Sequence, residues 1–272
     1  MRSKGSWKWT LIALIPTFFI VFPIYYVFVG SFETTSQIFH QPPYFFPPTP
    51  MFENYTKAFN VLGKYFFNSI IITAGVVFLT LLIAPLASFA LAKLKLRFER
   101  ILNFSFALTQ MLPFTSTVIP LYLIFRQLKL INTYYGVILA ISSFSISFAV
   151  IMLRSYMTSF PIALIEAATI DGAGIFKIYW KIVLPLSVPA ITTAAIFAFL
   201  QGWNNFVLPL ALLPENRLQP LSIGLFNFVG NFGVQWDTLM AGSVVYSIPS
   251  IIVIIVGSKF LVSGLTSGAF KE

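Results

Sequence analysis

The stretch of this 272-residue chain with the most distinctive chemistry runs from Glu166 to Pro185, between two long apolar runs. It is too polar to lie in lipid, because charged and amide groups are costly in hydrocarbon. Alanines after Pro161 predict a short, slim helix that another backbone can approach closely. Glycine turns freely into left-handed conformations, so Gly172 and Gly174 predict a sharp break. A second short amphipathic helix is expected to follow and to end at Leu184 and Pro185.

The spacing of this stretch is longer and more specific than that of an ordinary loop between two membrane helices. It reads Glu-Ala-Ala, three residues, Gly, nine residues, Ile, one residue and Leu-Pro. This pattern resembles the EAA loop of ABC importer permeases. The Asp171-Gly172-Ala173 variant and its flanks resemble the carbohydrate-uptake branch, similar to the smaller permease subunit of the maltose transporter. The resemblance covers nearly the whole chain.

The resemblance implies that residues 160–183 form coupling helices that dock in a cleft on a cytosolic ATPase subunit. Glu166 is then expected to meet a basic group on that subunit, because a charge-assisted pair gives both orientation and energy. Asp171 leaves two alternatives open, since it could cap the second helix or contact the partner. The residues expected to take part in ATPase coupling are Glu166, Ala167, Ala168, Asp171, Gly172, Ala173, Gly174, Leu184 and Pro185.

The same resemblance implies a set of partners. They are a second permease subunit, two cytosolic ATPase subunits, and an extracellular or periplasmic sugar-binding protein. ATP and Mg²⁺ would be held by the ATPase subunits, and no cofactor or metal is expected on this chain. The expected activity is uptake of a carbohydrate, with no enzymatic step on this chain. Uptake of another small polar solute, such as glycerol phosphate, is the alternative within the family.

The composition independently indicates a polytopic membrane protein. Hydrophobic residues make up 58% of the chain and charged residues 9%, whereas soluble domains carry roughly 25% charge. The chain has no cysteine, which excludes a disulfide framework, a zinc–thiolate site and a thiol nucleophile. The net charge of +9 does not indicate nucleic acid, because the basic residues are distributed as in a protein oriented in a membrane.

Apolar runs of about 20 residues predict an all-α fold with six transmembrane helices in one domain, residues 1–272. The predicted spans are about 11–31, 66–92, 103–125, 134–156, 184–212 and 239–261, with the coupling loop between the fourth and fifth. Six spans put both termini on one side of the membrane. That side carries Arg2, Lys4, Lys8, Lys93, Lys95, Arg97, Arg100, Arg154, Lys177, Lys181, Lys259 and Lys271, against five basic residues opposite.

This bias predicts that the termini and the Glu166 loop lie in the cytosol, because the positive-inside rule places loops rich in lysine and arginine on the cytosolic side of the membrane. The predicted location is the cytoplasmic (inner) membrane of a bacterium or archaeon. The His40 region, rich in proline, is predicted to be an extended external loop.

A second polar group lies within the predicted fifth span, at Gln201, Trp203, Asn204 and Asn205. Amides are costly in lipid, so these side chains are expected to face protein or water. One interpretation is a sugar path, where amides bond hydroxyl groups and Trp203 offers an apolar face to a sugar ring. The other is hydrogen bonding between helices, which is slightly favoured because single amides in bundles commonly do this. On a helix, Gln201 and Asn205 would share one face.

Several other classes of function are excluded or disfavoured. No phosphate-binding loop of the GxxxxGK[ST] type occurs, so ATP cannot bind in that way. A secondary transporter would predict internal repeats and intramembrane charge, and neither is found. An intramembrane enzyme would need a nucleophile paired with a base, and the only histidine of the chain, His40, lies in the first loop and not in a span. The sequence does not name the sugar.

Overall fold

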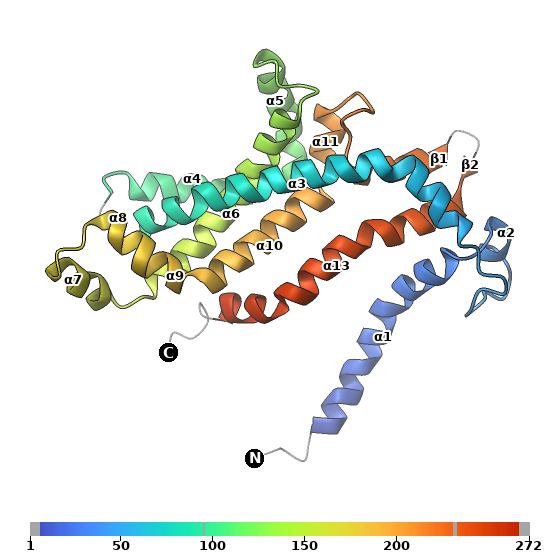
Figure 1. Cartoon of the computed structure of the whole chain (residues 1–272), viewed down its shortest axis with the longest axis horizontal. Coiled ribbons are helices and arrows are strands. Elements are labelled where there is room, and N and C mark those ends of the chain that lie inside the picture. Colours follow the sequence, from blue (N-terminus) through green and yellow to red (C-terminus); the bar gives the residue numbers. More distant parts are fainter. Residues whose placement is uncertain (1–5, 95, 231–232, 267–272) are drawn as a thin grey trace. The chain divides into compact units, whose positions relative to one another are not determined.

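The computed structural model describes residues 6–94, 96–230 and 233–266 (Figure 1). This part of the chain is mostly helical, as the composition predicted. The long helices are α1 (Ser6–Gly30), α3 (Glu53–Lys93), α4 (Glu99–Met111), α5 (Phe114–Gln127), α6 (Tyr134–Thr158), α10 (Val188–Asn204) and α13 (Trp236–Thr266). The short ones are α2 (Thr35–Ile38), α7 (Ile162–Ile170), α8 (Ile175–Ile178), the π-helical turn η1 (Tyr179–Val183), α9 (Leu184–Leu186), α11 (Val207–Leu212), α12 (Leu221–Gly224) and the 3₁₀ turn η2 (Leu225–Phe228).

Besides the helices, the described residues contain one short pair of strands. Two short strands, β1 (Val229–Gly230) and β2 (Gly233–Val234), pair antiparallel between the predicted fifth and sixth spans. Gly233 has a φ of +130°, a conformation that glycine reaches without the clash that a Cβ would cause.

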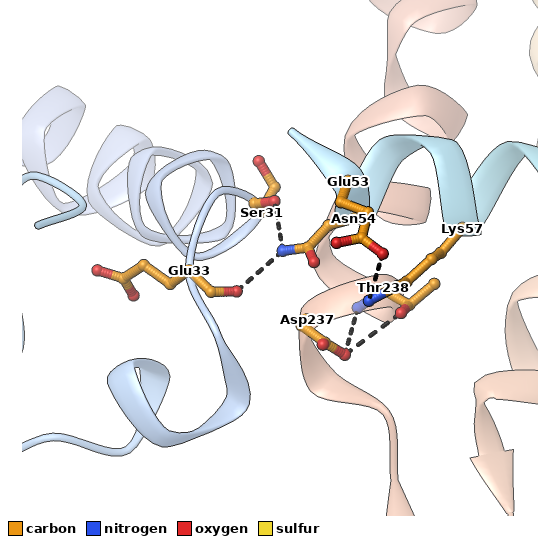
Figure 2. A network of polar contacts seen from close by, with 7 residues as sticks. All are labelled: Ser31, Glu33, Glu53, Asn54, Lys57, Asp237 and Thr238. Carbon is orange, nitrogen blue, oxygen red and sulfur yellow. Dashed lines mark hydrogen bonds and ion pairs between the residues drawn. The ribbon is translucent and has the colours of Figure 1, made fainter. Parts of the chain in front are cut away.

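The chain divides into two compact units, and α3 and α13 each contribute residues to both. The first unit comprises Met1–Lys64 and Gly224–Pro249. Figure 2 shows polar contacts within this unit: the side-chain amide of Asn54 donates to the backbone oxygens of Ser31 (3.2 Å) and Glu33 (2.9 Å). Asn54 at the start of α3 therefore holds the turn that follows α1. Glu33 in this turn is buried, with 1% of the residue exposed.

The second unit comprises Tyr65–Ile223 and Ser250–Glu272, and its helices pack on α6. Both α4 and α10 lie beside α6, and residues 65–93 of α3 share two apolar cores with it. Small residues allow the close approach: a Cβ at Gly202 of α10 would lie 2.9 Å from the Thr73 Cα of α3. Small side chains at helix crossings are typical of membrane bundles.

Two of the predicted spans are broken helices in the structure. The predicted third span is split between α4 and α5, with Leu112 extended (ψ 130°) just before Pro113. A proline disfavours helical backbone in the residue before it, which accounts for this break. The predicted fifth span is bent by 75° at Ser187 and interrupted again after Asn204. Pro209 accounts for the second break, since its ring clashes with the carbonyl four residues earlier, at Asn205.

The other predicted spans coincide with helices whose bounds differ from the prediction. α3 starts at Glu53, well before residue 66, where the second span was predicted to start. In the described residues, four helices are long and apolar enough to cross a membrane, and up to six spans result if each bent pair counts as one. The exact count and the bounds of the spans remain predictions. Residues 1–5 and 267–272, on which the predicted placement of the termini depends, lie outside the described residues.

Candidate coupling segment and amide cavity

The Glu166 segment, defined here as residues 160–185, folds as a helix, a tight turn and a second helical stretch. Helix α7 starts after Pro161, whose backbone is extended (ψ 127°), and ends at Ile170. Ser159 is the C-cap residue of α6, and its hydroxyl donates to the Tyr156 carbonyl. The segment thus has the helix–turn–helix form that the alanine and glycine pattern predicted.

The turn after α7 is a Schellman motif with Gly172 in the left-handed position. Gly172 has a φ of +75°. Its N–H donates to the Thr169 carbonyl (3.0 Å), and the Ala173 N–H donates back to the Ala168 carbonyl (2.9 Å). These are the two bonds that define the motif, and they satisfy the last carbonyls of the helix. Gly172 is therefore required by backbone geometry, as its position in the sequence pattern indicated.

The structure excludes one of the two alternatives for Asp171. Asp171 is the C-cap residue directly after α7, and its backbone N–H donates to the Ala167 carbonyl at 3.0 Å. Helix α8 begins at Ile175, its N-cap residue is Gly174, and no side chain caps it. The hypothesis that Asp171 caps the second helix is therefore wrong, because Gly174 occupies the N-cap position and no side chain forms a capping hydrogen bond there.

One face of the segment is anchored in a core of its own. Ala168, Ile178 and Tyr179 are buried there with Phe89 of α3 and Met157 of α6. The rings of Phe89 and Tyr179 lie 5.2 Å apart. The Nζ of Lys93 also donates to the Phe160 carbonyl at 3.0 Å, at the start of the segment. The segment is thus attached to the ends of α3 and α6 by side-chain packing.

The opposite face presents unpartnered groups. Glu166 and Ala167 are exposed, and in the part of the chain that the structure describes the Glu166 carboxylate has no hydrogen-bond or ion-pair partner. Ile170 and Phe176 flank the turn and are 86% and 76% exposed. Of the other predicted coupling residues, Ala173 and Leu184 are half-buried and pack on the segment's core, while Gly174 and Pro185 are exposed.

An ion pair that sequence reasoning missed lies near this segment. The Arg154 Nη2 atom of α6 is 2.6 Å from the Glu99 Oε1 atom of α4, and the Arg154 Nε donates to the Leu91 carbonyl of α3. The pair joins three helices. Its partners are 55 residues apart, so no local pattern could indicate it.

The second polar group surrounds two adjoining hollows of about 340 and 420 Å³, called here the amide cavity. The hollows share Gln201 and Asn205. Their lining is Thr109, Gln110, Leu112, Phe144, Phe197, Leu200, Gln201, Asn204, Asn205, Phe206 and Val207. Gln201, Asn204 and Asn205 are thus brought together, although Asn205 lies beyond the end of α10 and not on its face.

Trp203 does not line the amide cavity. It is 2% exposed and packs against Phe66 and Phe199, with ring centroids 5.7 and 5.8 Å away. The lining aromatic rings are instead those of Phe144, Phe197 and Phe206. Thr109 and Gln110 are further polar lining residues that the sequence group did not include, and Gln110 is the only additional amide. Its only sequence signal was an amide within an otherwise apolar run.

The comparisons with known proteins identify the family. Residues 83–266 match the family of binding-protein-dependent transport system inner membrane components. The chain belongs to this family. The matched region includes the whole Glu166 segment and the whole amide cavity.

The permease is also similar along its whole length to individual members. It is 32% identical to the diacetylchitobiose uptake system permease protein DasC of Streptomyces coelicolor, covering 99% of both chains. It is 30% identical to the trehalose transport system permease protein SugB of Mycobacterium tuberculosis, covering 100% of both. A permease chain in the crystal structure of a bacterial ABC transporter that imports the acidic polysaccharide alginate superposes with a TM-score of 0.81 at 25% identity, covering 95% of this chain and 98% of that one.

These matches confirm the class predicted from the EAA-like spacing. The permease is a multi-pass inner membrane protein and a translocation component, not an enzyme. Its family name implies that transport depends on a separate binding protein.

Proposed function

We propose that this permease forms one half of the path of an ABC importer for a carbohydrate, and that the Glu166 segment couples it to a cytosolic ATPase subunit. The names of its relatives, which refer to diacetylchitobiose, trehalose and alginate, support a carbohydrate substrate. The complete importer would contain a second permease subunit, two ATPase subunits and an extracellular or periplasmic sugar-binding protein. The permease would span the membrane six times within one domain, with both termini in the cytosol.

The observation that carries the coupling proposal is the exposure of Ile170 and Phe176 on a segment that is otherwise anchored. Large apolar side chains grouped at an exposed turn indicate a surface that another protein covers. They flank the Schellman turn, and the Glu166 carboxylate is exposed on the same segment, with no partner among the described residues. A cleft with apolar walls and a basic side chain would complement both features.

The anchoring contacts provide a way for motion of the ATPase to reach the path. The Phe89–Tyr179 contact links the segment to α3, while the stretch η1–α9 leads directly into α10. The 17 residues of α10 extend about 25 Å. The far end of this helix carries Gln201 and Asn204, at the amide cavity. We infer that displacement of the Glu166 segment is transmitted along α10 and changes access to this cavity.

The test compares two glutamates of matched exposure in the reconstituted importer. Glu166→Lys should weaken association of the ATPase subunits and abolish ATP-driven uptake, while the permease stays in the membrane. Glu215→Lys makes the same charge change at another exposed glutamate, between the predicted fifth and sixth spans on the side opposite the Glu166 segment, and should leave both unchanged. Normal ATPase association with Glu166→Lys, or an equal loss with Glu215→Lys, would refute the proposed coupling role.

A further inference from the structure

The amide cavity is polar without being charged. Its polar side chains come from two helices and the connection after α10: Thr109 and Gln110 from α4, and Gln201, Asn204 and Asn205. Among the described residues that line it, no side chain is ionisable. Pockets of a few hundred Å³ with mainly apolar walls and a few convergent polar groups are typical small-molecule sites.

The amides of the cavity retain hydrogen-bonding capacity. Gln201 is half-buried, and within the described residues its side chain has no hydrogen-bond partner. The Asn205 Oδ1 accepts from the Leu208 N–H at 3.2 Å, which leaves its two amide hydrogens available. The Gln110 Nε2 donates to the Phe144 carbonyl at 3.2 Å, which leaves its oxygen available. Donors and acceptors are therefore both present.

This mixture suits hydroxyl groups and does not suit anions. A sugar hydroxyl both donates and accepts, as an amide does. A carboxylate, sulfate or phosphate group only accepts, and proteins usually bind it through charge-assisted bonds from arginine or lysine. Moving such an anion into a cavity with apolar walls and no cation is expensive. The lining rings of Phe144 and Phe197 are equally compatible with the apolar face of an uncharged sugar.

We propose that the amide cavity selects uncharged carbohydrates, and that Gln110, together with Gln201 and Asn205, determines this specificity. The inference rests on the proposed function as a carbohydrate permease and goes beyond it by naming the substrate class and the residues. It excludes acidic sugars and glycerol phosphate as substrates of this path. It also replaces, for Gln201, the interpretation that the amides form hydrogen bonds between helices, because in the described structure the Gln201 side chain makes no hydrogen bond to a neighbouring helix.

The experiment measures sugar binding directly, so that the sugar-binding protein does not impose its own selectivity. The membrane complex of the two permease subunits and the two ATPase subunits, without the sugar-binding protein, is titrated in detergent with three probes: trehalose, diacetylchitobiose and an alginate disaccharide. Binding is followed by the change in thermal unfolding. The variants Gln201→Leu and Gln110→Leu remove amides from the cavity. Gln127→Leu is the matched control, because Gln127 is an exposed glutamine at the end of α5 that does not line the cavity.

We expect at least one uncharged sugar to bind and the alginate disaccharide not to bind. Gln201→Leu and Gln110→Leu should each weaken binding by about tenfold, the usual effect of about one hydrogen bond, while Gln127→Leu has no effect. Equal affinity for the acidic disaccharide, or unchanged affinity in both cavity variants, would overturn the inference and leave the carbohydrate function standing. If no sugar binds and the assembled importer transports a different solute, the proposed function itself fails.

Discussion

Replacing Gly172 by alanine should destabilise the turn of the Glu166 segment through backbone conformation alone. An added Cβ would meet no atom within 4 Å, so there is no steric collision with the rest of the protein. The φ of +75° is nevertheless unfavourable for alanine. The left-handed conformation costs about 1–2 kcal/mol in a residue with a Cβ. This cost corresponds to a factor of about 5 to 30 in the equilibrium between the closed and open turn.

The assay is hydrogen exchange of the Ala173 amide, which the turn holds in its bond to the Ala168 carbonyl. Exchange through local opening increases in proportion to the population of the open turn. We therefore expect Gly172→Ala to accelerate exchange by about 5- to 30-fold. Gly172→Asn should have a smaller effect, because asparagine tolerates this conformation better.

Gly174→Ala is the matched control, two residues away in the same segment. Gly174 also has no atom within 4 Å of an added Cβ, but its φ of −68° suits any residue. Exchange at Ala173 should therefore remain close to that of the unmodified protein. If Gly174→Ala accelerates exchange as much as Gly172→Ala, or if neither does, the positive φ is not what makes glycine necessary here.

Two further predictions concern stability. Gly202→Ala should lower the unfolding temperature, because the new Cβ would lie 2.9 Å from the Thr73 Cα. Gly63→Ala is the control and should not lower it, because the space around Gly63 is open. Equal effects of the two substitutions would contradict the close crossing of α3 and α10. Burial raises the pKa of Glu33, so the folded protein loses stability as pH rises from the ordinary glutamate range through this raised pKa. Glu33→Gln should therefore raise the unfolding temperature more at neutral than at acidic pH. Glu53→Gln, at the exposed carboxylate paired with Lys57 (Figure 2), should show no such trend. The same trend in both variants would refute the assignment of this pH dependence to Glu33.

Local features of the Glu166 segment were predictable because they depend on residues close in sequence. A left-handed residue that ends a helix favours glycine, so Gly172 could be identified from the pattern alone. Helix breaks near Pro113 and Pro209 follow from equally local rules. The predicted fifth span missed the second break because the apolar run continues across it, although the proline gave a usable signal.

Features that depend on packing between distant segments were not predictable. Trp203 was expected near the amides because it is next to them in sequence. Its ring instead packs against Phe66 of α3 and Phe199 and does not line the amide cavity. Gln110 joins Gln201 only because α4 and α10 both lie beside α6. The burial of Glu33 likewise depends on the turn that Asn54 holds, 21 residues later.

The central claim is that an ATPase subunit covers the exposed face of the Glu166 segment. The most direct measurement places a photoreactive amino acid at position 170, whose native isoleucine is 86% exposed, in the assembled importer. Position 46 serves as the control, since Phe46 is 78% exposed but lies in the predicted external loop. We predict a covalent product between position 170 and the ATPase subunit, and none from position 46. Crosslinking of position 170 only to lipid or to the sugar-binding protein would contradict the coupling role.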